Sequence, residues 1–123
     1  MMNEDNPQKT LVILNDPPYG SERSYNGLRL AGALARNELT DVKVFLMGDA
    51  VACALAGQDT PKGYYNLERM VRLVTNHGGE VGTCGTCMDA RGLEETALTE
   101  GVHRSTLDQL ASWTRWAEKV IVF

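Results

Sequence analysis

Three observations predict an α/β fold in which helices cover both faces of a parallel sheet. Short, continuous apolar runs recur along the 123-residue chain, and segments of helical periodicity lie between them. The runs are too short for helices and rich in β-branched residues, which is typical of strands buried on both faces. Strands that alternate with helices favour parallel pairing, because each helix returns the chain to the start of the next strand.

The first half of the chain predicts two strands and three helices. Residues 1–8 are polar and we expect a disordered tail there, followed by a strand at residues 10–14. Ser21 is placed to cap a helix over residues 22–36. A second strand is expected at residues 42–47. A short helix over residues 50–56, an exposed loop over 58–65 and a helix capped by Asn66 complete this half. The two longer helices have apolar stripes at Leu28, Ala31, Leu34 and Ala35, and at Leu67, Met70, Val71 and Val74.

The second half predicts a short strand at residues 80–83, a turn with two cysteines, and a last strand at residues 120–123. Residues 91–100 are ambiguous and compatible with a short helix. Ser105-Thr106-Leu107-Asp108 is similar to a capping box with Asp at its last position. The helix that follows is expected to bury Leu107, Leu110, Ala111, Trp113 and Ala117. No repeat or second domain is visible, so residues 9–123 are predicted to form one domain.

Composition narrows the class of protein. The net charge is −4 without a basic stripe, so nucleic acid is not an expected direct partner. No apolar run approaches the roughly 20 residues of a membrane span. The polar, acidic amino terminus is unlike a signal peptide, and three cysteines without an export signal favour the reducing cytoplasm. In that compartment a thiol is more often reactive or buried than part of a structural disulfide.

The candidate chemistry is concentrated in Cys84-Gly85-Thr86-Cys87, at the expected change from strand to helix. A thiolate at a helix amino terminus gains from the helix dipole and from free backbone N–H groups, which lower its pKa. Arg91 lies four residues after Cys87 and can return to the same helical face. Asp89 opposes a thiolate if it points inward. Cys53, within an apolar segment, is interpreted as a small buried hydrophobic residue.

Several uses of this thiol pair remain open from the residues alone. One is disulfide exchange, in which one cysteine attacks and the other resolves. Another is transport of sulfur as a persulfide. A zinc site would need four ligands, and Cys84, Cys87, His77 and His103 are the available set, although the histidines lack metal-binding spacing. The last is a pair of inert thiols in a tight turn.

A second candidate surface is the loop Asn15–Ser21, which follows the first strand. The carboxyl ends of parallel strands share one edge of the sheet, where ligands collect. Tyr19, Ser21 and Glu22 are the candidate ligand-binding residues. The loop contains a single glycine, so it is neither a Walker loop nor a dinucleotide fingerprint.

The chain from about Lys9 to Phe123 resembles the DsrE/DsrF-like family. The resemblance is carried by the runs Pro18-Tyr19-Gly20-Ser21-Glu22, Leu28-Arg29-Leu30-Ala31, Phe45-Leu46-Met47-Gly48-Asp49-Ala50-Val51 and Cys84-Gly85-Thr86-Cys87-Met88-Asp89-Ala90-Arg91-Gly92. It implies a three-layer α/β/α fold with a five-stranded, mainly parallel sheet. It also implies a trimer or hexamer with the cysteine near subunit contacts.

Relatives in this family include sulfur-relay proteins, whose sulfur-bearing cysteine aligns with Cys84. The resulting hypothesis is a cytoplasmic sulfur-relay protein that works with a sulfur donor and an acceptor protein. Cys84 is its persulfide carrier, Cys87 the resolving or assisting thiol, and Arg91 a stabiliser of the anion. This chemistry requires no metal and no cofactor. The competing hypotheses are a non-catalytic oligomeric binding module and a thiol–disulfide oxidoreductase.

Overall fold

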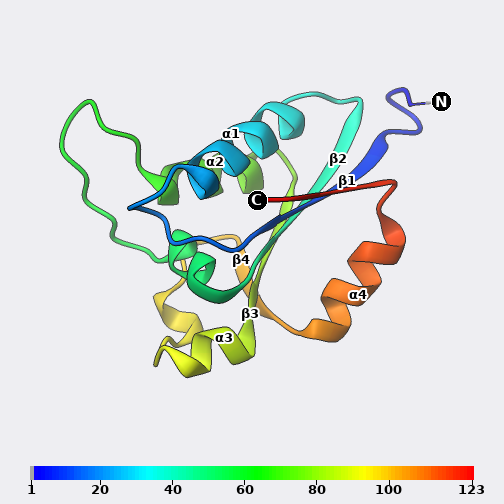
Figure 1. Cartoon of the computed structure of the whole chain (residues 1–123). Coiled ribbons are helices and arrows are strands. Elements are labelled where there is room, and N and C mark those ends of the chain that lie inside the picture. The colour runs from blue at the N-terminus through cyan, green and yellow to red at the C-terminus, as the bar shows by residue number, and fades with distance from the viewer. Residues whose placement is uncertain (1) are drawn as a thin grey trace.

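A five-stranded sheet runs through the protein, whose computed structural model describes residues 2–123. The strands are β1 (Gln8–Leu14), β2 (Thr40–Leu46), β3 (Glu80–Cys84), β4 (Val102–Ser105) and β5 (Lys119–Val122). Their order across the sheet is β4-β3-β2-β1-β5, and every neighbouring pair is parallel (Figure 1). The predicted fold class is therefore confirmed.

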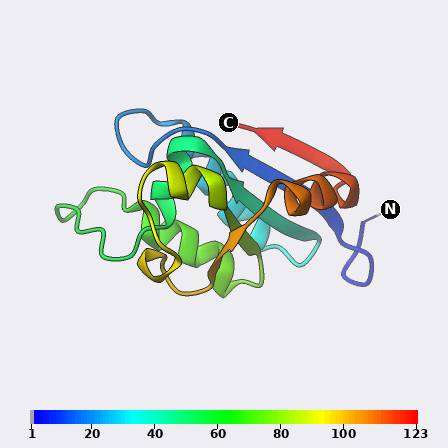
Figure 2. The same ribbon diagram turned by 90° about the horizontal axis from the view of Figure 1, so that it is seen from below.

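Helices form a layer on each side of this sheet. α1 (Arg23–Ala35) and α2 (Leu67–Asn76) pack side by side on one face, and α3 (Gly85–Ala90) and α4 (Leu107–Trp116) lie on the other. Figure 2 shows α3 and α4 in front of the strands. Two short 3-10 helices, η1 (Gly48–Ala54) and η2 (Glu95–Ala97), lie in the connections. This is the expected three-layer α/β/α arrangement.

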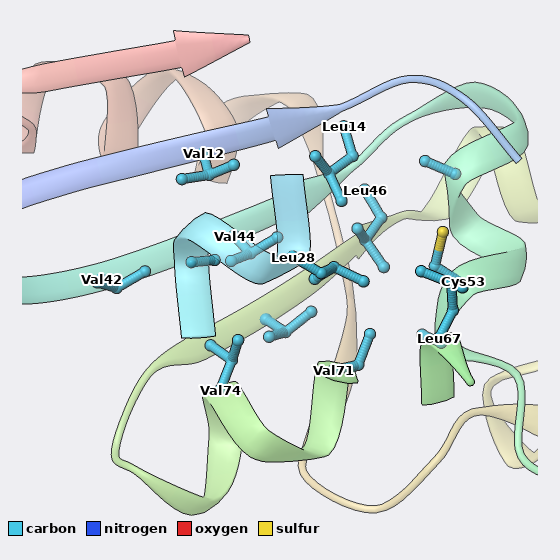
Figure 3. Packing of buried hydrophobic residues seen from close by; sticks show 14 residues of the cluster. Val12, Leu14, Leu28, Val42, Val44, Leu46, Cys53, Leu67, Val71 and Val74 are labelled. Carbon is cyan, nitrogen blue, oxygen red and sulfur yellow. The ribbon is translucent and has the colours of Figure 1, made fainter. Parts of the chain in front are cut away.

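The larger part of the core lies between the sheet and the α1–α2 layer. Val12, Val44 and Leu46 point from the strands towards Leu28 and the α2 side chains (Figure 3). The predicted stripes of both helices supply this contact, and their most buried members are Leu28, Ala31, Leu67, Val71 and Val74. Hydrophobic periodicity located these helices because each has one apolar face to bury.

A smaller apolar cluster lies on the other face and holds the cysteine turn in place. The Phe45 ring meets Trp113 edge to face, with 6.0 Å between ring centroids. Met88 of α3 and Leu110 of α4 pack into the same cluster, which also includes Cys84. The predicted burial of Leu107 is wrong, because its side chain is 70% exposed at the start of α4.

Strand β4 is missing from the predicted elements. Its sequence, Val102-His103-Arg104-Ser105, has one apolar residue in four, so it carries no strand signal of its own. It forms because its backbone pairs with β3 at the edge of the sheet. The strand also moves the cap of α4 from Ser105 to Thr106, whose side chain accepts from the Gln109 amide.

The amino-terminal boundary also differs from the expectation. Asn3 and Asn6 pair across a tight turn, and β1 begins at Gln8, whose amide donates to the Leu39 carbonyl at 2.8 Å. The described part of the predicted disordered tail therefore contains local structure, and Met1 lies outside the described residues. Between residues 2 and 123 no helix is long and apolar enough to cross a membrane.

The cap of α2 gives a first prediction. Asn66→Ala removes the acceptor for the Arg69 amide (3.1 Å) and the donor to the Gln58 carbonyl (2.9 Å). Loss of a cap costs about 1 kcal/mol, and the part-buried Gln58 carbonyl left without this donor adds up to about as much again, so urea denaturation should show a loss of about 2 kcal/mol. Thr106→Ala removes only the cap of α4 and should cost about half of this. Equal losses of stability in the two variants would contradict a contribution from the hydrogen bond that Asn66 donates to the Gln58 carbonyl.

Candidate functional site

Three connections meet at the carboxyl edge of the sheet, where β1, β2 and β3 end. β2 leads through Met47 into η1, and β3 leads directly into α3. Cys84 is both the last residue of β3 and the N-cap of α3. The paired strand fixes its backbone, so the thiol has a defined position at the start of the helix. The predicted strand–turn–helix arrangement is present, with β3 one residue longer than expected.

The Cys84 sulfur is largely enclosed and receives hydrogen bonds from its own turn. Its Sγ accepts from the Cys87 amide at 3.4 Å and lies 3.3 Å from Thr86 Oγ1. The residue is 8% exposed. Because α3 has only six residues, these local groups rather than a long helix dipole carry the electrostatic effect.

The pKa values of the two thiols in the turn shift in opposite directions. Burial raises the pKa of Cys84. Hydrogen bonds from the side chains and backbone amides of Cys87 and Thr86 lower it, and together they outweigh the effect of burial. The pKa of Cys84 therefore falls below its ordinary value. Burial and the hydrogen bond to Cys84 raise the pKa of Cys87. Of the two thiols, Cys84 is therefore the one that loses its proton more readily, and Cys87 donates a hydrogen bond to it.

Arg91 lies against Cys87 rather than against Cys84. Its guanidinium donates to Asp49 Oδ1 at 2.8 and 3.1 Å and to the Cys87 carbonyl at 3.0 Å. The charge of Arg91 and the Gly48 amide both act to lower the pKa of Cys87, but burial and Cys84 outweigh them. The expected return of Arg91 to the face of Cys87 is present, and its charge acts on the second thiol of the pair.

Arg104 is a site residue that the sequence reasoning missed. It comes from β4 and forms a two-pronged ion pair with Asp89, with both N–O distances at 2.8 Å. A Cβ at position 85 would lie 2.9 Å from the Arg104 Cζ and Nε atoms, so Gly85 is what lets the guanidinium lie across the turn. Arg104 and a Cys84 thiolate stabilise each other electrostatically. No sequence signal identified it, because β4 itself was not predicted.

Asp89 does not oppose the thiolate as the sequence suggested. The Arg104 guanidinium holds its pKa below the usual range and neutralises its charge. Each arginine of the turn is thus matched with a carboxylate, Arg104 with Asp89 and Arg91 with Asp49. These ion pairs are partly exposed, so we assign them a positioning role rather than a large contribution to stability.

The predicted ligand-binding residues of the first loop are used mainly within the fold. The Tyr19 hydroxyl donates to Gln58 Oε1 at 2.6 Å and accepts from the Leu67 amide. Ser21 donates to Asp16 Oδ2 at 2.8 Å, and its oxygen accepts from the Arg23 amide at 3.4 Å. The N-cap of α1 is Glu22 rather than Ser21, and its exposed side chain makes no cap hydrogen bond. No hydrogen bond or ion pair between residues 2 and 123 joins these three residues to Cys84 or Cys87.

The zinc alternative has no assembled ligand set. His77 Nδ1 lies 2.8 Å from the Leu73 carbonyl, and His103 Nε2 lies 2.9 Å from Gln109 Oε1 beside Trp113. Within the described residues no three His, Cys, Asp or Glu side chains are grouped as metal ligands. Cys53 is buried with its Sγ 3.9 Å from the Asp16 carbonyl, and burial raises its pKa to about 12. Its thiol is therefore protonated at neutral pH, consistent with the predicted structural role.

The fold and this turn define a small α/β protein with a thiol pair at the end of a central strand. Comparison with family models matches residues 8–123 to the DsrE/DsrF-like family. The chain belongs to that family. Membership supports a role of the sulfur-relay type, and it confirms the resemblance seen in the sequence.

Individual relatives extend the match over nearly the whole chain. Protein YchN of Escherichia coli K12 is 44% identical over 117 residues, which cover 94% of this chain and 99% of that protein. Protein MK0008 of Methanopyrus kandleri is 38% identical, with 91% of each chain covered. The crystal structure of the E. coli ychN protein matches with a TM-score of 0.88 at 43% identity, covering 94% of this chain and 99% of that one. The match therefore covers nearly all of this chain and of the E. coli protein, and the fold is shared with the E. coli ychN structure.

The charges beside the turn give a second prediction. Arg104→Gln should raise the pKa of Cys84, because it removes the positive charge beside that thiolate. Arg91→Gln should instead raise the pKa of Cys87. The rate of iodoacetamide alkylation across pH, resolved for each cysteine by mass spectrometry, measures both. In the parent protein Cys84 should react at a lower pH than Cys87.

Arg115→Gln, an exposed change on α4, is the matched control and should leave both alkylation profiles unchanged. If either variant shifted both thiols equally, separate assignment of the two arginines would be wrong.

Proposed function

We propose that this protein is a cytoplasmic sulfur-relay protein that carries persulfide sulfur on Cys84. The supporting observation is the hydrogen bonding of its sulfur, which lowers the pKa of Cys84 while the pKa of Cys87 is raised. A thiolate at neutral pH is the attacking species in sulfur transfer. Family membership supports the same general role.

The proposed reaction is an exchange of the outer sulfur between thiols. The Cys84 thiolate attacks the outer sulfur of a persulfide on a donor protein, a new S–S bond forms, and the donor leaves as its thiolate. A thiolate of the acceptor protein then attacks the outer sulfur on Cys84, which leaves as a thiolate in turn. The hydrogen bonds from Thr86 and from the Cys87 amide stabilise Cys84 in this leaving state.

Cys87 gives the site a second possible outcome. Its thiol donates to the Cys84 sulfur, so it is placed to attack the inner sulfur of a Cys84 persulfide. That attack would form a Cys84–Cys87 disulfide and release hydrosulfide. The same pair would serve a thiol–disulfide oxidoreductase, which is the second candidate function. In the relay, Cys87 remains a thiol and assists Cys84.

Tandem mass spectrometry after incubation with a small-molecule persulfide donor provides the third prediction. Trypsin cleaves after Arg72 and Arg91, so both turn cysteines lie on one peptide and fragmentation must locate the added sulfur. We expect one extra sulfur on Cys84 in the parent protein and in Cys87→Ser, and none in Cys84→Ser. Cys53→Ser is the control for general thiol reactivity.

A peptide whose mass falls by two hydrogens, with no added sulfur, would contain a Cys84–Cys87 disulfide and would indicate disulfide exchange instead. An unmodified peptide, with both thiols alkylated only after unfolding, would favour the non-catalytic binding module.

We also propose that the protein forms a homo-oligomer through the β5 edge of the sheet. Val120 and Val122 are 42% and 62% exposed, although they are β-branched strand residues. They pair in register with Leu11 and Ile13, so they extend the sheet face that packs against α4. β5 pairs with β1 on one side only, and an apolar edge strand of this kind is typical of a surface covered by another chain.

Light scattering after size-exclusion chromatography gives the fourth prediction. The parent protein should have the mass of a trimer or hexamer, and Val122→Asp should reduce it, because a buried carboxylate without a partner destabilises an interface. Leu39→Asp, at a 36% exposed residue before β2, is the control and should keep the parent mass. A monomeric parent protein would exclude the oligomer.

A further inference from the structure

The charge of the protein is divided between its layers. α1 and α2 together contain four arginines and one acidic residue, and a fifth arginine, Arg36, is the C-cap of α1, although the whole chain has a net charge of −4. The single acidic residue, Glu68, is engaged, because its Oε1 accepts from the Gly57 and Gln58 amides at 3.0 Å. The α1–α2 layer is therefore a basic surface on an acidic protein.

A groove of about 520 Å³ lies on this layer, between the two helices. Leu30, Met70 and Leu73 give it apolar walls, and Gly32 and Ala33 keep it open. A Cβ at Gly32 would lie 2.6 Å from Leu73 Cδ2, so the absence of a side chain at Gly32 sets how closely the helices approach. The groove lies on the opposite face of the sheet from α3 and the thiol pair (Figure 1).

Two arginines line this groove. Both are exposed. Arg29 lies in α1 and Arg36 is the C-cap residue of that helix, seven residues further on, which places them about 10 Å apart along the helix axis. Arg29 is held by neutral groups, through a 3.2 Å hydrogen bond to Asn26 and a position 5.4 Å above the Tyr25 ring. Within residues 2–123 neither arginine pairs with a carboxylate. Both charges are available to a partner.

We propose that this groove binds an amphipathic helix of a partner protein whose polar edge is acidic. The apolar walls suit the leucine-type stripe of such a helix, as in other helix-in-groove complexes. Two acidic residues seven positions apart on the bound helix match the spacing of Arg29 and Arg36. A nucleic acid fits less well, because it would neutralise the arginines but leave the Leu and Met walls without an apolar partner. This inference is independent of the proposed sulfur chemistry.

The test uses the full chain and a labelled synthetic helix of about 18 residues, long enough to remain helical when bound. Its sequence has leucines at helical spacing and glutamates seven positions apart on one flank, and the comparison peptide has lysine at each glutamate. Fluorescence anisotropy should show binding of the glutamate peptide only. Arg29→Glu with Arg36→Glu should weaken that binding about tenfold or more.

The matched control is Lys62→Glu with Arg115→Glu, which changes the net charge equally at two exposed residues outside the groove. It should bind the peptide as the parent does. Both double variants should keep the alkylation profile of Cys84. Loss of peptide binding can therefore be distinguished from a failure of the sulfur-relay proposal. NMR shifts caused by the peptide should gather at Gly32, Ala33 and Leu73.

Three results would overturn the proposal: equal binding of both peptides, no binding of either, or binding that the groove variant leaves unchanged. A short RNA duplex serves as the alternative ligand. If it bound through Arg29 and Arg36 while the glutamate peptide did not, the surface would be assigned to nucleic acid instead.

Discussion

The site depends on one constraint, which is that Cys84 ends a paired strand and caps the next helix at the same time. β3 lies between β2 and β4, so the Cys84 backbone is hydrogen-bonded within the sheet before the chain turns. The turn then directs the Cys87 amide and the Thr86 side chain at one sulfur. A thiol in a flexible loop would lose conformational entropy on adopting this arrangement, whereas here the sheet already fixes the backbone of Cys84.

Each thiol of the turn has an arginine near it. Arg104 from β4 lies beside Cys84, and Arg91 at the end of α3 lies beside Cys87. Each guanidinium is oriented by a carboxylate that would otherwise disfavour a nearby thiolate. Burial raises the pKa of both thiols, and hydrogen bonds then separate them, since the bond that Cys87 donates to Cys84 lowers the pKa of Cys84 and raises that of Cys87. Two cysteines in equivalent surroundings would not give one defined nucleophile.

The two faces of the sheet have different chemistry. The face with α3 and α4 contains the thiol pair, and the exposed β5 valines extend it at the edge of the sheet. The opposite face is covered by a basic helical layer with an apolar groove. The proposed relay, the β5 interface and the groove are compatible on this molecule.

Sequence alone determined the features that depend on local pattern. The apolar runs of β1, β2, β3 and β5, the stripes of α1 and α2 and the Asn66 cap follow from periodicity and capping chemistry, which neighbouring residues specify. The fold class and the place of the thiol turn at a strand end follow from the same signals. The family resemblance added the fifth strand, which the residues of β4 could not predict.

Tertiary structure alone decided how distant residues meet. Arg104 lies 20 residues after Cys84 (104 − 84) on a strand that exists only by pairing with β3, so no local pattern could place it beside the thiol. Tyr19 and Ser21, the candidate ligand-binding residues of the first loop, form hydrogen bonds with Gln58, Leu67 and Asp16, which the sequence could not show. The basic layer was invisible in sequence because its arginines are divided between two helices that become neighbours only when the sheet forms. Periodicity fixes which face of an element is buried, and the packing of elements fixes which side chains share a site.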